Sequence, residues 1–198
     1  MAMSNKAQAR QRQILDAAAI CFARRGFHQT TMDDICREVQ LSPGSVYRYY
    51  RSKDEIIAAF VEDDSRDMSD LLRQVGALPN LWQGLDWLVD QLVAAINSPL
   101  YAELSAEIGS ETIHNPRIAS LVRQSDQANH QALIELFSLA QQRGQLPTDL
   151  DLPQIADLII MLIDGLTWRK GLYPEHDLTL YAAGLKHTIK YLLSGTRF

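Results

Sequence analysis

The sequence of 198 residues lacks the features that would suggest a secreted, membrane or metal-dependent protein. It has only two cysteines, Cys21 and Cys36, and neither belongs to a CxxC or Cys/His cluster. We therefore expect buried reduced thiols rather than disulfides, a redox site or a metal site. The N-terminus has no apolar segment typical of a signal peptide, and the apolar run Leu158 to Ile163 is far too short to span a membrane. These absences predict a cytoplasmic protein that needs no metal or cofactor.

Catalytic motifs are also missing. The sequence contains no HExxH zinc motif, no nucleophile elbow and no phosphate-binding loop. Its five histidines are scattered along the chain: His28, His114, His130, His176 and His187. Since no set of residues forms a recognisable catalytic constellation, we expect that the protein is not an enzyme.

Charge is distributed unevenly along the chain. Residues 1–53 carry nine Lys or Arg and four Asp or Glu, a balance of +5, whereas the whole chain has a net charge of −5. Residues 54–198 therefore carry −10. A basic N-terminal part on an acidic protein indicates that this part meets a polyanion.

The pattern of apolar residues is helical almost throughout, and period-2 alternation typical of strands is absent. It predicts an all-α fold of about nine helices. They are expected over residues 6–25, from Met32, from Pro43, from Lys53, and near 81–97, 100–110, 116–143, 152–169 and 177–194.

The first 53 residues have the proportions of a three-helix helix-turn-helix domain. Thr31 and Asp34 predict a capping box at the second helix, and Ser52 with Glu55 predicts another at the fourth. Ser42 is expected to cap the third helix, whose first residue is Pro43. We therefore divide the chain into a helix-turn-helix DNA-binding domain, 1–53, and a helical bundle, 54–198.

The segment that follows the predicted turn is both basic and aromatic. It reads Tyr47-Arg48-Tyr49-Tyr50-Arg51-Ser52-Lys53 and contains no acid. With the preceding helix, turn and capping serine, it resembles the DNA-binding head of the TetR family of bacterial regulators, over about residues 10–60. The acidic helical remainder is similar to the subgroup of that family that includes BetI and AcrR.

The resemblance implies binding to double-stranded DNA through the third helix. Small residues at the start of that helix can approach base edges, and Arg48 can donate to guanine. Tyr47 and Tyr49 can bind phosphate, as can Lys53 and Thr31 at helix starts. Tyr50 is expected in the core. Asp33 is expected to interact with the dipole at the start of its helix rather than to contact a base. The predicted DNA-binding residues are Thr31, Ser42, Pro43, Gly44, Ser45, Tyr47, Arg48, Tyr49 and Lys53.

The resemblance also implies a small-molecule effector held by the C-terminal helices. Polar residues within an apolar helix stripe, together with aromatic side chains, either belong to a core or meet a ligand. The candidates are Trp82, Trp87, Tyr101, Glu107, Ser125, Asn129 and Trp168. Glu103, Glu107 and Glu111 form a row on one helix, which is either a solvated face or a site for a lipophilic cation.

The last two helices are expected to form a homodimer interface, as in the family. The helix near 152–169 is apolar nearly all round, so it needs burial on more than one side. The predicted interface residues are Ile155, Ile159, Leu162, Leu166, Tyr181, Ala182, Leu185 and Ile189.

Together these features predict a TetR-like repressor that binds a palindromic operator as a homodimer and is released by a small effector, a lipophilic cation or an aromatic compound. In a bacterial cell it would lie in the cytoplasm, on the nucleoid when bound to its operator. Two alternatives stay open: a DNA-binding helical protein with no small-molecule effector, and a helical interaction scaffold.

Overall fold

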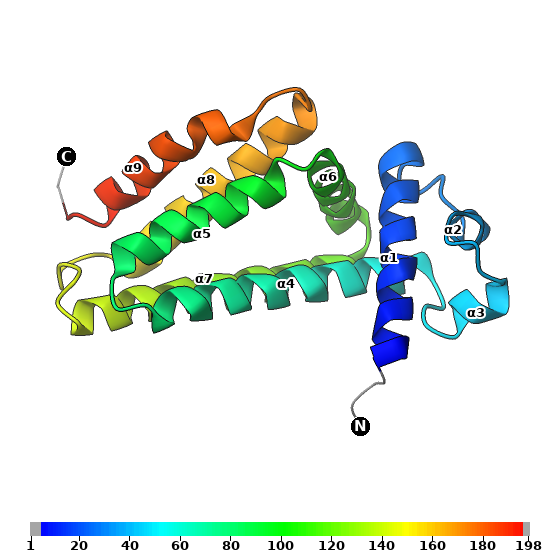
Figure 1. The fold of residues 1–198 in the computed structure, drawn as a ribbon, viewed down its shortest axis with the longest axis horizontal. Helices are drawn as coiled ribbons and strands as arrows, with labels where there is room; N and C mark the ends of the chain where they lie inside the picture. The colour runs from blue at the N-terminus through cyan, green and yellow to red at the C-terminus, as the bar shows by residue number, and fades with distance from the viewer. Residues whose placement is uncertain (1–4, 196–198) are drawn as a thin grey trace. The chain divides into compact units, whose positions relative to one another are not determined.

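The computed structural model describes residues 5–195, apart from the side chains at positions 5 and 99, and within them it is helical with no strand (Figure 1). This confirms the all-α prediction. The helix over 100–110 begins at Pro99 and continues to His114, and the predicted last helix is divided into a 3-10 helix and α9. No described helix is long and apolar enough to cross a membrane. The elements are α1 (Asn5–Arg25), α2 (Met32–Glu38), α3 (Pro43–Tyr47), α4 (Lys53–Ala77), α5 (Leu81–Ile96), α6 (Pro99–His114), α7 (Pro116–Gln142), α8 (Leu152–Leu172), η1 (Leu178–Tyr181) and α9 (Ala182–Leu192).

The chain forms two compact units, and each is built from two segments. The first contains the residues up to 63 together with 103–122, and the second contains 64–102 and the residues from 123 onward. Helices α4, α6 and α7 therefore contribute residues to both units. The predicted boundary after residue 53 lies inside the first unit, and the assignment of functions to 1–53 and 54–198 remains a prediction.

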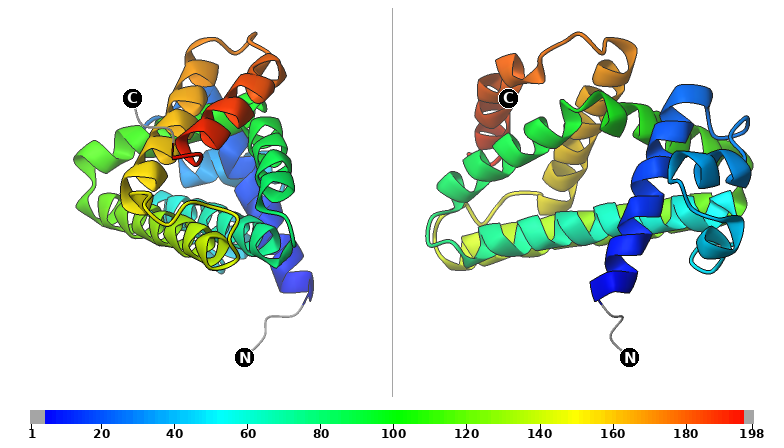
Figure 2. Two further views of the ribbon diagram at one scale, coloured as in Figure 1. Left: turned by 90° about the vertical axis from the view of Figure 1, so that its left-hand side faces the viewer. Right: turned by 45° about the vertical axis from the view of Figure 1, so that its right-hand side comes forward.

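The core of the first unit unites the N-terminal helices with residues far along the chain. Helix α2 lies against both α1 and α3 (Figures 1 and 2). The predicted stripe of α1 is buried, including Ile14 and Phe22, and α4 adds Ile56 and Ile57. Ile118, at the start of α7, is fully buried in the same cluster. Residues 1–53 alone thus do not complete this core.

Both cysteines lie in the first unit as free, buried thiols, as predicted. Burial raises the pKa of Cys21 and of Cys36, and the nearby carboxylates of α2 raise both further. Since the thiolate is the reactive form, these side chains behave as small apolar core residues.

The turn between α2 and α3 has a fixed geometry. The N–H of Leu41 donates to the carbonyl of Cys36 (3.1 Å), and that of Gln40 donates to the carbonyl of Arg37 (3.2 Å). These are the two bonds of a Schellman motif, whose left-handed position is usually glycine. Gln40 occupies that position with φ = 57°, at a cost of roughly 1–2 kcal/mol. The hydrogen bonds of the turn therefore outweigh the conformational preference of residue 40.

The predicted helix starts have different outcomes. Thr31 and Asp34 form a complete capping box, as predicted. Ser52 accepts a hydrogen bond from the N–H of Glu55 (3.2 Å), but Glu55 reaches back to the N–H of Arg51 rather than to that of Ser52. At α3 Ser42 is the N-cap residue and Pro43 the first residue of the helix, as predicted, but the Ser42 side chain makes no cap bond and contacts the Ser45 hydroxyl instead (2.8 Å).

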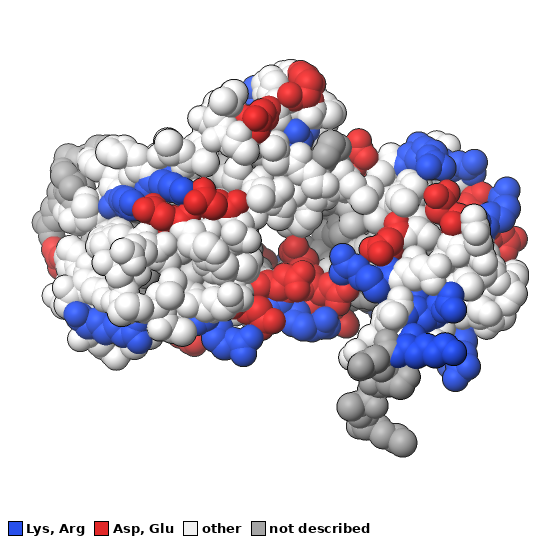
Figure 3. Space-filling model, viewed as in Figure 1, with Lys and Arg blue, Asp and Glu red and all other residues white. Residues whose placement is uncertain are grey.

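The second unit is organised around α5, which lies against η1 and α9 and also contacts α8. Two ion pairs reinforce the contact between α9 and α5: Lys186 with Asp90 (2.6 Å) and Lys190 with Asp86 (2.7 Å). A band of mixed charge over these helices is visible in Figure 3. The core beneath them contains Phe137 of α7, which is fully buried.

Candidate nucleic-acid interface

Helix α3 has one buried side and one free side. Val46 is fully buried, whereas Ser42, Pro43 and Gly44 are exposed and Ser45 is half-buried. A Cβ atom added to Gly44 would meet nothing within 4 Å, so the packing of this protein does not require glycine there. The start of α3 therefore presents a surface without bulk, as expected for a segment that approaches another molecule closely.

The three tyrosines after α3 have different environments. Tyr47 is exposed, Tyr49 is half-buried against the core, and Tyr50 is buried. Burial, together with smaller effects from the charges of Asp63 and Glu62, raises the pKa of Tyr50 to about 12. The core position predicted for Tyr50 is confirmed.

Arg48 and Arg51 are exposed, and their guanidinium groups form no hydrogen bond or ion pair with another described residue. The arginines of α1 and α2 differ, because Arg24 pairs with Glu38, and Arg25 and Arg37 pair with a single aspartate. On the face drawn in Figure 3, Lys and Arg side chains gather over the N-terminal helices. Because Arg24, Arg25 and Arg37 are paired within the protein, the charges of Arg48 and Arg51 are the ones available for a binding partner.

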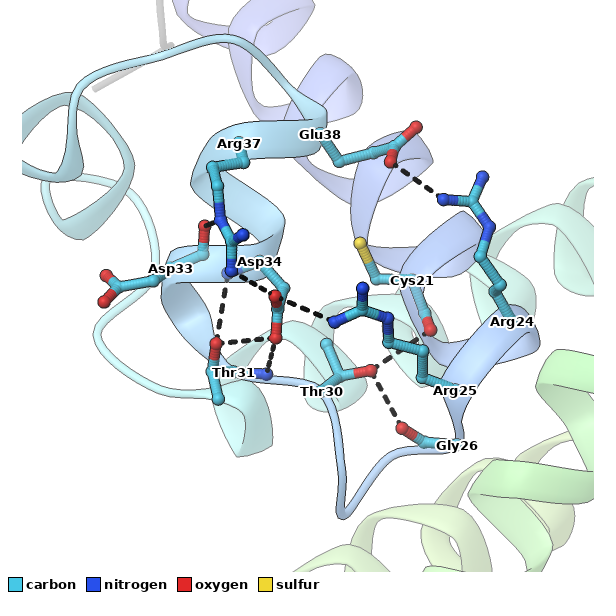
Figure 4. A network of polar contacts seen from close by, with 10 residues as sticks. All are labelled: Cys21, Arg24, Arg25, Gly26, Thr30, Thr31, Asp33, Asp34, Arg37 and Glu38. Carbon is cyan, nitrogen blue, oxygen red and sulfur yellow. Dashed lines mark hydrogen bonds and ion pairs between the residues drawn. The ribbon is translucent and has the colours of Figure 1, made fainter.

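Thr31 belongs to a closed polar network (Figure 4). Its hydroxyl donates to the carboxylate of Asp34 (2.7 Å) and accepts from the N–H of Asp34 (3.1 Å). The other carboxylate oxygen accepts from Arg25 (3.0 Å) and Arg37 (2.5 Å). The hydrogen bonds with Thr31 lower the pKa of Asp34, and the two arginines lower it further. The donor of the Thr31 hydroxyl is thus already used, which weakens its predicted role as a phosphate ligand.

Lys53, the first residue of α4, also has partners inside the protein. Its ammonium group donates to the carbonyls of Phe27 and His28 and lies 4.3 Å from the centre of the Phe27 ring. Burial lowers the pKa of Lys53, while the charges of Glu111 and Asp54 oppose this effect. An ammonium group has three donors, so a phosphate contact would add to these bonds.

The acidic row of α6 is neither a plain solvated face nor a free cation site. Glu107 accepts a hydrogen bond from the N–H of Phe27 (2.7 Å). Glu111 is buried and pairs with the imidazole of His28 (2.8 Å). The sequence predicted that Glu107 binds an effector. It did not predict the hydrogen bond with Phe27, which lies eighty positions earlier in the chain. Its four-residue spacing from Glu103 and Glu111 was the signal in the sequence.

The other predicted effector residues do not share one environment. Trp82 and Trp87 pack on the core of the second unit, and Trp168 is exposed. Ser125 is half-buried, as is Asn129, whose side-chain oxygen is buried and has no hydrogen-bond partner among the residues that the structure describes.

Two carboxylates of the second unit that the sequence reading missed have unusual surroundings. Asp64 accepts a hydrogen bond from the Tyr101 hydroxyl (3.0 Å). Although Asp64 is exposed, partial removal of its carboxylate from water raises its pKa, Asp67 raises it further, and the Tyr101 bond opposes the shift. Asp164 is also exposed, and partial removal from water raises its pKa, with a smaller effect from Asp126. A cationic ligand beside either group would favour its charged form.

The predicted dimer residues fall into two groups. Ile155, Ile159, Leu185 and Ile189 are buried in the core of the second unit itself. Leu162 and Tyr181 are exposed, and Leu166 and Ala182 are half-buried. A separate apolar stripe is exposed along α8: Leu158, Met161, Leu162, Trp168 and Leu172.

Two family models match the sequence. Residues 14–60 match the bacterial regulatory proteins of the tetR family, and residues 85–194 match the C-terminal part of BetI-type transcriptional repressors. The HTH-type transcriptional regulator UidR of Escherichia coli (strain K12) is 25% identical over 166 residues, which cover 83% of each chain.

Solved structures share the fold. Salmonella enterica GusR has a TM-score of 0.76 at 27% identity, covering 93% of this chain and 95% of its own. FadR from Bacillus subtilis in complex with stearoyl-CoA has a TM-score of 0.79 at 17% identity, with 94% and 99% covered. A regulator from Saccharomonospora viridis in complex with choline has a TM-score of 0.70 at 20% identity, with 93% and 95% covered. The helix-turn-helix unit and the two matched segments show that the chain belongs to the TetR family of bacterial transcriptional regulators.

Proposed function

We propose that this regulator is a repressor that binds a palindromic operator as a homodimer and is released by a small molecule. The observation that carries the DNA-binding part is the division of α3 between a buried Val46 and a free surface flanked by unpaired arginines. Small exposed residues allow the start of α3 to enter the major groove, where Arg48 can donate two hydrogen bonds to guanine. Arg51 fits a contact to backbone phosphate. The protein would act in the bacterial cytoplasm, on the nucleoid.

A second copy of the chain would supply the second recognition helix for the operator and would cover the exposed apolar stripe of α8. Two recognition helices about 34–36 Å apart can read successive turns of a palindrome. The exposed stripe of α8 lies beside Gly165, and α9 has an exposed Gly184. A Cβ atom at either glycine would meet nothing within 4 Å of this chain. Glycine inside a helix costs about 1 kcal/mol relative to alanine, so both positions favour close approach of a partner helix.

The effector that fits the second unit is a lipophilic cation. Asp64 is an exposed residue, but its neighbours remove part of its carboxylate from water, which raises its pKa, and the Tyr101 hydroxyl donates a hydrogen bond to it. The neighbouring structures contain ligands of opposite charge, choline and stearoyl-CoA, so the shared fold does not select the ligand and the residues of this chain must do so.

Replacing Arg48 by alanine should lower operator affinity by roughly 1–3 kcal/mol and relax specificity at one base pair, because a bidentate base contact is lost. Arg51→Ala is the matched control, since it removes an equally exposed and unpaired charge. It should weaken operator and scrambled DNA equally and reduce the salt dependence. Gel-shift titration of both sequences measures the difference. Equal behaviour of the two variants would show that α3 does not read bases through Arg48.

Trp168→Glu should weaken the homodimer roughly 30-fold, because a charge would be buried within the proposed interface. Ile113→Glu provides the control, since Ile113 is an even more exposed apolar residue, on α6. Sedimentation equilibrium should give dimers of equal Kd for the wild type and Ile113→Glu, and a Kd roughly 30-fold higher for Trp168→Glu. A monomeric wild-type protein would contradict the proposal.

A cationic effector should raise the melting temperature, and Asp64→Asn should abolish that effect. A ligand at about 100 times its Kd adds roughly 2.7 kcal/mol, or several degrees for a chain of this size. Choline, tetraphenylphosphonium and stearoyl-CoA are suitable probes for a thermal-shift assay. If none of them shifts the melt or releases operator DNA, the alternative of a regulator without a small-molecule effector is favoured.

A further inference from the structure

The acidic row of α6 contacts the DNA-binding helices of the first unit. Glu103, Glu107 and Glu111 follow each other at intervals of about one turn. Glu107 and Glu111 reach the loop that joins α1 to α2, whereas Glu103 forms no hydrogen bond or ion pair with another described residue. The same helix thus supplies two carboxylates with a specific partner and a third without one.

The loop is shaped to receive these carboxylates. Gly26 has φ = +79°, and a Cβ atom at this position would lie 3.6 Å from a carboxylate oxygen of Glu107. The next N–H, that of Phe27, points at the same carboxylate (2.7 Å). Hydrogen bonds to a charged acceptor are about twice as strong as neutral ones. Glu111 adds the bond to the His28 side chain, from a position with only 3% of its surface exposed.

Lys53 binds the same loop. It donates to the carbonyls of Phe27 and His28, so each of these residues is bound both by α6 and by the start of α4. Lys53 follows directly on the segment that carries Arg48 and Arg51. The position of the loop therefore affects the end of the DNA-reading segment.

We propose that Glu107 and Glu111 are positioning residues for operator binding: they fix the loop between α1 and α2, and through it Lys53, in the arrangement that binds DNA. This inference rests on the proposed function as a DNA-binding regulator. Neither carboxylate touches DNA, since both are committed to the loop.

The direction of the change in operator affinity distinguishes a positioning role from a mere change in net charge. Removing a carboxylate makes the protein more positive, which by itself strengthens binding to a polyanion. Loss of positioning weakens operator binding instead. Glu107→Ala and Glu103→Ala change the charge equally, at the same type of helical position, so their difference reports the loop contact alone.

The experiment measures operator affinity together with hydrogen exchange of the Phe27 amide. Glu107→Ala should bind the operator about 2- to 30-fold more weakly than the wild type and exchange this amide faster, whereas Glu103→Ala should do neither. Glu107→Gln, which keeps an oxygen acceptor, should recover most of the affinity. Glu111→Met should weaken binding like Glu107→Ala, because it removes the oxygen acceptor for His28 while it keeps a buried side chain of similar size if the alanine variant does not fold.

Operator binding by Glu107→Ala equal to that of Glu103→Ala would overturn the inference, even if the loop exchanges faster. If the wild type binds no palindromic DNA while Arg48→Ala is equally inactive, the proposed function fails instead. The amide exchange then still decides whether the carboxylate holds the loop, because identical exchange in the wild type and Glu107→Ala would overturn that contact.

Discussion

The DNA-binding unit depends on a core that its own sequence segment does not complete. Ile118 of α7 is fully buried among the residues of α1 and α4, and Leu104 and Ile108 of α6 pack against the same cluster. Burial of a side chain of this size contributes about 1.5–3 kcal/mol, a large part of the stability of a small domain. The helices that surround α3, the proposed recognition helix, are therefore held by residues that occur much later in the chain.

Electrostatic pairing determines where this unit can bind a polyanion. Arg24, Arg25 and Arg37 are paired with acids of α2, which leaves their region nearly neutral. Arg48 and Arg51 lack such partners, so the free charge lies where the exposed start of α3 can be presented to a groove. Once the ion pairs are taken into account, the excess positive charge of residues 1–53 is thus concentrated beside α3.

The sequence was informative where short-range rules decide the structure. The capping box at Thr31 and the buried Tyr50 follow from local pattern and spacing. The side-chain cap bond expected from Ser42 is absent because its hydroxyl has a competing partner in Ser45. The role of Glu107 could not be predicted, since its partner Phe27 is distant in sequence and a carboxylate row looks the same whether it faces water or another helix. Likewise, α8 is apolar nearly all round, so its sequence does not tell whether the side of Ile159 or the side of Met161 faces the core of the second unit.

Native-state hydrogen exchange of the Ile118→Ala protein tests most directly whether the DNA-binding unit is built from two chain segments. Removing this buried side chain should cost about 2–5 kcal/mol. We expect the amides of α1, α2 and α3 to lose protection, although the substitution lies in α7. Leu136→Ala, in the core of the second unit, should leave their protection unchanged. Wild-type protection of α1 to α3 in the Ile118→Ala protein would show that residues 1–53 fold independently and would contradict this account.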